Sequence, residues 1–213
     1  FNAFFTRHLQ QGARPVAGNT QLISPVDGTI SQIGQISSGD IFQAKGHNFS
    51  VDSLLANEQD AANFNSGSFT TIYLAPHDYH RIHAPASGKL LSISYIPGKL
   101  FSVNPTTTAH VPGLFARNER VVCIFETDIG KMALVMVGAL IVGSIVTTWS
   151  GLAAEKYNFK YQRQDYNNIS VTQGDDIAHF QLGSTVVLLT EQQLNWHTGL
   201  TANSLLKMGQ ALI

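Results

Sequence analysis

Residues 132–154, "MALVMVGALIVGSIVTTWSGLAA", decide between a membrane-spanning helix and a folded β core. The stretch contains no charged residue and reaches the length of roughly 20 residues that a spanning helix needs. However, Gly138 and Gly143 interrupt it, and Val, Ile and Thr dominate its composition, which favours strands. We therefore predict two buried strands separated by a break at Gly143 and Ser144.

The same β pattern recurs along the chain, in apolar and β-branched runs bounded by Pro, Gly and Asn. Further strands are predicted at residues 28–36, 68–74, 89–95, 120–126, 169–171 and 185–189. Short helices are expected at the N-terminus, where Phe1, Phe4, Phe5 and Leu9 have helical spacing, and around residues 53–63. The fold class is therefore predicted to be mainly β, in the α+β group.

A weak internal repeat indicates how such strands are arranged. "SPVDGTISQIGQI" from Ser24 and "APASGKLLSISYI" from Ala84 share the pattern Pro-x-x-Gly-x-aliphatic, followed by alternating apolar and polar residues. Each copy is typical of a turn that leads into a strand. Duplicated units of this kind predict a barrel-like or sandwich-like core built from two similar halves.

Length and composition set limits on the class of protein. A chain of 213 residues with 44% hydrophobic content can bury one sizeable core, so a single domain over residues 1–213 is predicted. The formal net charge of −1 provides no overall basic field, so nucleic acid is not an expected partner. The single cysteine, Cys123, lies in an apolar run and is interpreted as a small buried hydrophobic residue.

Three of the eight histidines lie close together in "APHDYHRIHAP", at His77, His80 and His83. The flanking prolines exclude a long helix, and an extended segment would place His77 and His83 on one face and His80 on the other. A zinc site is one interpretation, although no H-E-x-x-H motif or cysteine cluster accompanies it. Structural histidines beneath a loop are the other.

The run "HFQLGSTVVLL", residues 179–189, places Gly183 and Ser184 directly before a predicted strand. By itself, a Gly-Ser step is ordinary turn chemistry. The residues alone give its hydroxyl no special task.

Five motifs in a fixed order give these residues a common context. They are "SPVDG" with Asp27, "DYHRIHAP" with His80 and His83, "LFARNERVV" from Leu114, "VGSI" from Val142 and "LGST" with Ser184. Together with "FNAFFTRHLQQGARP" at the start and "KMGQALI" at the end, this order resembles the phosphatidylserine decarboxylase family. The resemblance covers almost the whole chain.

The resemblance implies that the protein cuts its own peptide bond between Gly183 and Ser184. The products would be a large β chain of residues 1–183 and a small α chain of residues 184–213. Ser184 would become a covalent pyruvoyl group, so neither a bound cofactor nor a metal is expected. Asp27, His83 and Ser184 are implied as the self-cleavage triad, with Asp27 orienting the base His83. His80 is implied as the acid or base of decarboxylation.

The resemblance also implies a substrate and a place of action. Phosphatidylserine would be converted to phosphatidylethanolamine and CO2 through a Schiff base with the pyruvoyl group. Because a diacyl lipid keeps its chains in the bilayer, we expect peripheral contact with an anionic membrane surface, on the cytoplasmic face of a bacterial cell membrane. The aromatic N-terminal stretch and residues 95–103 are candidates for that contact, and a homodimer is left open. Candidate headgroup ligands are Arg81, Lys89, Lys99, Arg117 and Arg120.

Two functions from other classes remain as alternatives at this point. A non-catalytic binding or carrier module built on the repeat would explain the duplicated turns but would leave "LGST" without a role. A metal-dependent hydrolase would use His77, His80 and His83 as ligands.

Overall fold

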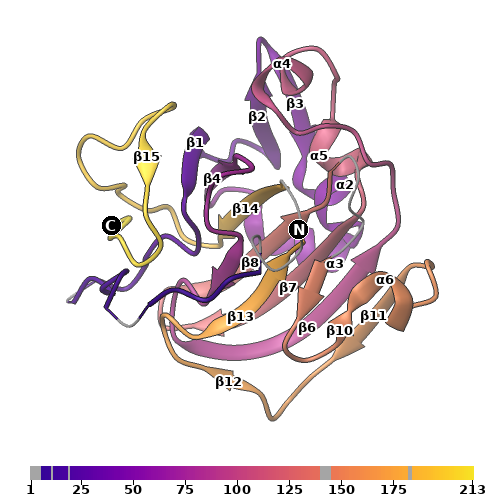
Figure 1. Ribbon diagram of the computed structural model, residues 1–213. Helices are drawn as coiled ribbons and strands as arrows, with labels where there is room; N and C mark the ends of the chain where they lie inside the picture. The colour runs from indigo at the N-terminus through magenta and orange to yellow at the C-terminus, as the bar shows by residue number, and fades with distance from the viewer. Residues whose placement is uncertain (1–5, 11, 19, 140–144, 182–183) are drawn as a thin grey trace.

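The computed structural model describes residues 6–10, 12–18, 20–139, 145–181 and 184–213 (Figure 1). The large sheet contains β1 (Gly28–Gln35), β4 (Ser68–Leu74), β6 (Gly88–Ile96), β7 (Arg120–Thr127), β8 (Gly130–Val137), β11 (Gln162–Asp165), β12 (Ser170–Val171), β14 (Ser184–Thr190) and β15 (Leu205–Leu206). A smaller sheet contains β5 (Arg81–His83), β9 (Ile145–Thr147), β10 (Gly151–Leu152) and β13 (Asp176–Phe180). A hairpin is formed by β2 (Asp40–Ala44) and β3 (His47–Ser50).

The helices are short. They are α2 (Val51–Leu55), α3 (Glu58–Ala61), the 3-10 helix η1 (Ala62–Phe64), α4 (Pro105–Thr108), α5 (Leu114–Arg117) and α6 (Ala153–Lys156). Side chains of Ser50, Asn57 and Asn104 cap the N-termini of α2, α3 and α4. The helices predicted around residues 53–63 are thus present. Residues 1–5 of the predicted N-terminal helix lie outside the described residues, and residues 6–10 are not helical.

The large sheet is antiparallel and follows the order β11-β6-β7-β8-β14-β4-β1-β15, with β12 also paired to β6. This confirms the predicted mainly β class, although the described strands form an open path and not a closed barrel. The central strand β14 is buried on both faces: Val186 and Leu188 belong to one hydrophobic cluster, Val187 and Leu189 to the other. Burial on both sides explains why this strand reads as a continuous apolar run.

The charge-free stretch at residues 132–154 folds as strands, as predicted. It forms most of β8 and then β9, β10 and the start of α6. The predicted break at Gly143 and Ser144 falls within residues 140–144, outside the described residues. Among the helices that are described, none has the length and apolar character needed to cross a bilayer.

The internal repeat corresponds to two equivalent strands, β1 and β6. Each begins at a glycine that packs against a neighbouring backbone: an added Cβ would collide with the Tyr73 carbonyl oxygen at Gly28 and with the Glu126 carbonyl oxygen at Gly88. Each strand also has a register irregularity beginning two residues after its glycine. The predicted two similar halves are therefore β1-β4-β14 and β6-β7-β8, joined where β14 pairs with β8.

The two repeat turns contact each other. The backbone N–H of Ile23 donates to the Pro85 carbonyl, and the N–H of His83 donates to the Pro25 carbonyl, each with an N···O distance of 2.9 Å. This pairing brings the Asp27 turn next to the histidine segment, although the two are more than fifty residues apart in sequence.

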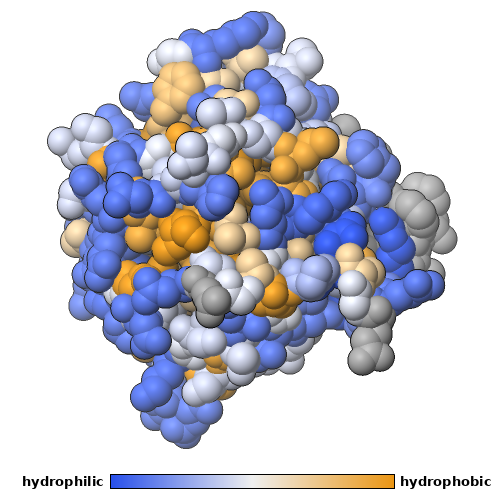
Figure 2. All heavy atoms as spheres, turned by 90° about the vertical axis from the view of Figure 1, so that its left-hand side faces the viewer, coloured by the Kyte–Doolittle hydropathy of each residue, from blue (hydrophilic) through white to orange (hydrophobic). Residues whose placement is uncertain are grey.

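Two hydrophobic clusters lie on opposite faces of the large sheet. One packs against the small sheet and α6, and the other against the β2–β3 hairpin, α2, α3, η1 and α5. The face that carries β15 is mostly hydrophilic, with apolar side chains appearing between polar ones (Figure 2). Leu205 of β15 is the most exposed large apolar side chain among the described residues, at 76%.

Candidate active site

Ser184 opens β14, where it pairs with Leu74 of β4. Its side chain is fully buried, and its Oγ has no hydrogen-bond partner among the described residues. Buried hydroxyls almost always find a partner, so an unpaired one needs an explanation. Gly183, the other side of the predicted cleavage site, lies outside the described residues.

His83 ends β5 and is held at both ring nitrogens. Its Nδ1 lies 2.7 Å from the Gly174 carbonyl oxygen, and its Nε2 lies 2.8 Å from the Tyr79 hydroxyl. A carbonyl oxygen can only accept, so Nδ1 carries the proton and Nε2 accepts from the Tyr79 O–H. His83 is therefore in the tautomer whose Nε2 lone pair can act as a base.

Asp27 is buried beside a different set of partners. Its carboxylate accepts from Arg14 Nε at 2.9 Å and from the backbone N–H of Met208 at 2.8 Å, and Lys207 Nζ lies 3.6 Å away. Burial alone would raise the pKa of Asp27, but the hydrogen bonds from Arg14 and Met208 and the nearby positive charges outweigh it and lower that pKa. Within the described structure, Asp27 makes no hydrogen bond to His83.

His80 is fully buried just before β5, with its Nδ1 2.8 Å from the Asp78 carbonyl oxygen. Burial lowers the pKa of His80, which favours the neutral ring. Residues 75–78 form a turn closed by a hydrogen bond from the Asp78 N–H to the Ala75 carbonyl, so the alternation that an extended segment would give does not apply there. His77 sits exposed on that turn, so it does not share a face with His83.

No group of three potential metal ligands converges anywhere in the described residues. The five basic residues proposed as headgroup ligands divide into two sets, one paired within the protein and one exposed. Arg81 is paired with Asp176, and the guanidinium of Arg120 donates to backbone carbonyls inside the protein. The exposed ones are Lys89, Lys99 and Arg117.

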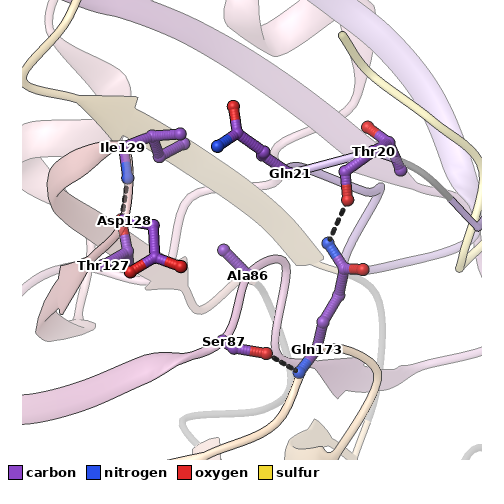
Figure 3. A pocket seen from close by; sticks show the side chains of 8 residues that line it. All are labelled: Thr20, Gln21, Ala86, Ser87, Thr127, Asp128, Ile129 and Gln173. Atoms are coloured by element: carbon purple, nitrogen blue, oxygen red, sulfur yellow. Dashed lines mark hydrogen bonds between the residues drawn. The ribbon is translucent and has the colours of Figure 1, made fainter.

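A cavity of about 180 Å³ is lined by Gln173, the residue before Gly174, together with Thr20, Gln21, Ala86, Ser87 and residues 127–129 (Figure 3). Gln173 lines one side of it: its side-chain amide donates to the Thr20 carbonyl, and its backbone N–H donates to Ser87 Oγ. None of the four predicted active-site side chains lines this cavity. These bonds fix the loop at Gln173. The carbonyl of the next residue, Gly174, accepts the hydrogen bond from His83 Nδ1.

Sequence reasoning did not find several residues that hold the site. They are Arg14, Tyr79, Gly174 and Met208. Tyr79 lies in the same motif as His80 and His83, so its position in that motif could have indicated a role at the site. The contacts of Gly174 and Met208 use backbone atoms, which leave no signature in residue type.

The described structure thus places a buried serine and two buried, hydrogen-bonded histidines on an antiparallel β scaffold. Such a set of side chains is typical of an enzyme. Comparison with known proteins specifies which one: a model of the phosphatidylserine decarboxylase family matches residues 1–213. The chain belongs to the phosphatidylserine decarboxylase family and is a decarboxylase.

Individual relatives agree along the whole chain. A phosphatidylserine decarboxylase proenzyme from Methylobacillus flagellatus is 52% identical over 217 residues, which cover 100% of this chain and 77% of the relative. The proenzyme from Idiomarina loihiensis is 50% identical over 220 residues, covering 100% of this chain and 75% of the relative. The proenzyme from Ectopseudomonas mendocina is 49% identical over 219 residues, covering 100% and 77%. Family membership decides against the carrier module and the metal hydrolase.

Proposed function

We propose that this chain cuts itself between Gly183 and Ser184, converts Ser184 to a pyruvoyl group, and then decarboxylates phosphatidylserine to phosphatidylethanolamine. The observation that carries the proposal is the buried Oγ of Ser184 at the first position of β14, which has no hydrogen-bond partner among the described residues. A buried hydroxyl without a partner costs stability, and a reaction at that atom gives a reason to retain it. The proenzyme name of the relatives is consistent with such processing.

In the proposed cleavage, Ser184 Oγ forms a bond to the carbonyl carbon of Gly183 as its proton passes to His83 Nε2. The C–N bond then breaks, and His83 returns the proton to the Ser184 nitrogen, which leaves an ester. Loss of the Ser184 Cα proton expels the carboxylate of residue 183 and leaves dehydroalanine. Its hydrolysis releases ammonia and yields the pyruvoyl end.

The geometry of His83 supports its role as the base. Nδ1–H is fixed by Gly174, so the ring already has the required tautomer, and Tyr79 must leave Nε2 before it takes the Ser184 proton. Asp27 contributes its charge next to this segment, because the turn that carries it binds the His83 backbone through Pro25.

The residues around Ser184 fit a pyruvoyl group, since a buried serine side chain with no competing bond is free to be converted. That group would supply a carbonyl that binds the substrate amine and draws electrons from it as CO2 leaves. His80 would give a proton to the carbon that loses the carboxylate. Because burial lowers the pKa of His80, its protonated ring is a stronger acid than that of an ordinary histidine.

The substrate is proposed to reach the site from a membrane surface. Lys99 and Arg117 are exposed and adjacent, with the Lys99 N–H donating to the Arg117 carbonyl at 2.9 Å. The Arg117 guanidinium lies 4.9 Å from the centre of the Phe101 ring, which is partly exposed. Two cations beside an apolar loop suit peripheral contact with anionic lipid.

The decisive experiment is the intact mass of purified wild-type chain and of Ser184→Ala. Wild type is expected as two pieces, residues 1–183 and 184–213, with the smaller piece carrying a pyruvoyl end, and Ser184→Ala as one uncut chain. Ser92→Ala is the matched control, because Ser92 Oγ is also buried and unpaired, and this variant is expected to be cut. Cleavage of Ser184→Ala would overturn the proposal.

A further inference from the structure

Three consecutive polar residues, Asn118, Glu119 and Arg120, are buried where α5 meets β7. Asn118 and Arg120 have partners for their side chains. The Asn118 amide donates to the carbonyls of Phe101 and Gly138, and the Arg120 guanidinium donates to those of Ser53, Leu54 and Asn118. Both residues therefore have a structural function, as buried polar groups usually do.

Glu119 between them is different. It is 7% exposed, and its Oε2 accepts from the Tyr95 hydroxyl at 2.9 Å, but its Oε1 has no partner among the described residues. Burial raises the pKa of Glu119, and the Tyr95 hydrogen bond lowers it only in part. A buried carboxyl oxygen without a donor is costly, so a donor that arrives with a ligand would explain it.

Sheet register places Glu119 in the same row as Ser184. Thr185 pairs with Val137, and Val137 pairs with Arg120, so the next row towards the strand ends contains Ser184, Gly138 and Glu119. The Gly138 N–H donates to the Glu119 carbonyl at 2.9 Å, which fixes the last step of this row. With strands about 4.8 Å apart, the Cα atoms of Ser184 and Glu119 are separated by roughly 10 Å.

The side chains of that row point to one face of the sheet. Tyr95, the partner of Glu119, belongs to the cluster between the large and small sheets, as do Met136 and Val186, whose alternation places Gly138 and Ser184 on the same side. The residue of this row that lies between Ser184 and Glu119 is Gly138, so the row itself places no side chain between them.

We propose that Glu119 binds the amine of the aminophospholipid through Oε1 and removes its proton, which makes the amine nucleophilic next to residue 184. This inference rests on the proposed function, because that function supplies an amine at this position. The ammonium N–H bond breaks, the nitrogen keeps the electron pair, and the proton forms an O–H bond at Oε1. A carboxylate and an ammonium become a neutral acid and a neutral amine, and a buried site favours the neutral pair.

The surroundings favour this transfer. Tyr95 is the titratable group that contacts Glu119 from the neighbouring strand, and Tyr157 stacks against the Tyr95 ring, with centroids 5.9 Å apart. Arg120, the nearest cation in sequence, directs its guanidinium to backbone carbonyls. Among the described residues no guanidinium or ammonium donates to the Glu119 carboxylate, and burial raises its pKa, so Glu119 is a stronger base than an exposed carboxylate.

The test is Glu119→Gln, with Glu126→Gln as the control, because Glu126 is exposed on β7, the strand that begins directly after Glu119. Both variants are expected to be cut into two pieces. At neutral pH, kcat/KM of Glu119→Gln should fall by about 10²-fold or more, the range of a lost general base, and recover as rising pH deprotonates the substrate amine. A purely structural role predicts no such recovery, and a cut variant that matches wild type, or that stays inactive at every pH, contradicts the proposal.

Binding gives a readout independent of turnover. Calorimetric titration of the mature enzyme with short-chain phosphatidylethanolamine should be weakened about 10-fold or more by Glu119→Gln, whereas short-chain phosphatidylglycerol, which lacks an amine, should be unaffected. Equal effects on the two lipids, or no effect on either, would overturn the assignment. These readouts use cut enzyme, so their failure is distinct from failure of the cleavage experiment on Ser184→Ala.

Tyr95→Phe serves if Glu119→Gln is not cut. It keeps the carboxyl group but removes the donor that lowers the pKa of Glu119. The rising limb of the decarboxylation pH profile should therefore move to higher pH, and an unmoved limb counts against Glu119 as the base.

Discussion

Asp27 and Glu119 are two buried carboxyl groups that differ in the hydrogen-bond donors around them. Asp27, at 2% exposure, accepts hydrogen bonds from Arg14 and Met208, whereas the Tyr95 hydroxyl is the one donor among the described residues to the carboxylate of Glu119, which is 7% exposed. The pKa of Asp27 is lowered and that of Glu119 is raised. Similar burial with opposite shifts shows that the partners, and not depth alone, decide which form a buried carboxyl takes.

The same contrast separates two regions of the molecule. Around Asp27 and His83, the side chains are hydrogen-bonded within the protein, so this region holds a fixed arrangement. Along the row that contains Ser184 and Glu119, Ser184 Oγ and Glu119 Oε1 have no hydrogen-bond partner among the described residues. We infer that the first region positions side chains, whereas the second can bind a polar group of a ligand.

The largest effect expected in the hydrogen-bonded region is on cleavage itself. His83→Ala removes the proposed base and Asp27→Ala removes the charge that supports it, so both should leave one uncut chain and no decarboxylation. A denaturing gel gives the result directly. His77→Ala, an exposed histidine from the same motif, is the control and should be cut. Normal cleavage of His83→Ala would show that this region is structural.

His80→Ala tests whether cleavage and turnover use different histidines. We expect it to be cut into two pieces, because its proposed role begins after cleavage, and to release CO2 about 10²–10⁴-fold more slowly. The measurement is CO2 release from carboxyl-labelled phosphatidylserine, alongside a gel of the same sample. An uncut His80→Ala chain, with His83→Ala cut normally, would reverse the two assignments.

The smallest effects expected are opposite pH trends in stability, measured by urea unfolding in the uncut Ser184→Ala background. Asp27 has a lowered pKa, so its stabilisation is present above its unfolded-state pKa of about 3.9 and is lost as the pH falls through the folded value. Asp27→Asn should therefore be less stable than its parent near neutrality, and the deficit should shrink in acid.

Glu119 has a raised pKa, so its favourable contribution is present below its unfolded-state pKa of about 4.3 and is lost as the pH rises through the folded value. Glu119→Gln should gain stability relative to its parent as the pH rises from about 4, by roughly 1.4 kcal/mol for each pKa unit of displacement. Parallel trends for Asp27→Asn and Glu119→Gln would contradict the contrast between the two carboxyl groups.

Much of the fold follows from local patterns. Alternating and continuous apolar runs located β4 and β14 within a residue of their ends, and the Pro-x-x-Gly repeat predicted two equivalent halves. The residues left open whether the histidine segment is extended, and the structure places a turn closed by the Asp78 N–H at residues 75–78. Periodicity along a short segment does not reveal a turn of that kind.

The sequence by itself determined the strand class, the family and the residue types at the site, because side-chain periodicity and ordered motifs are properties of the linear chain. Only the tertiary structure decided the partners: Gly174 on His83 from 91 residues away, Met208 on Asp27 from 181 residues away, and Glu119 in one row with Ser184. Those contacts depend on strand order and register. Strand order and register decide which donors come within hydrogen-bonding distance of a buried group, and those donors decide whether the group is charged, neutral or unpaired.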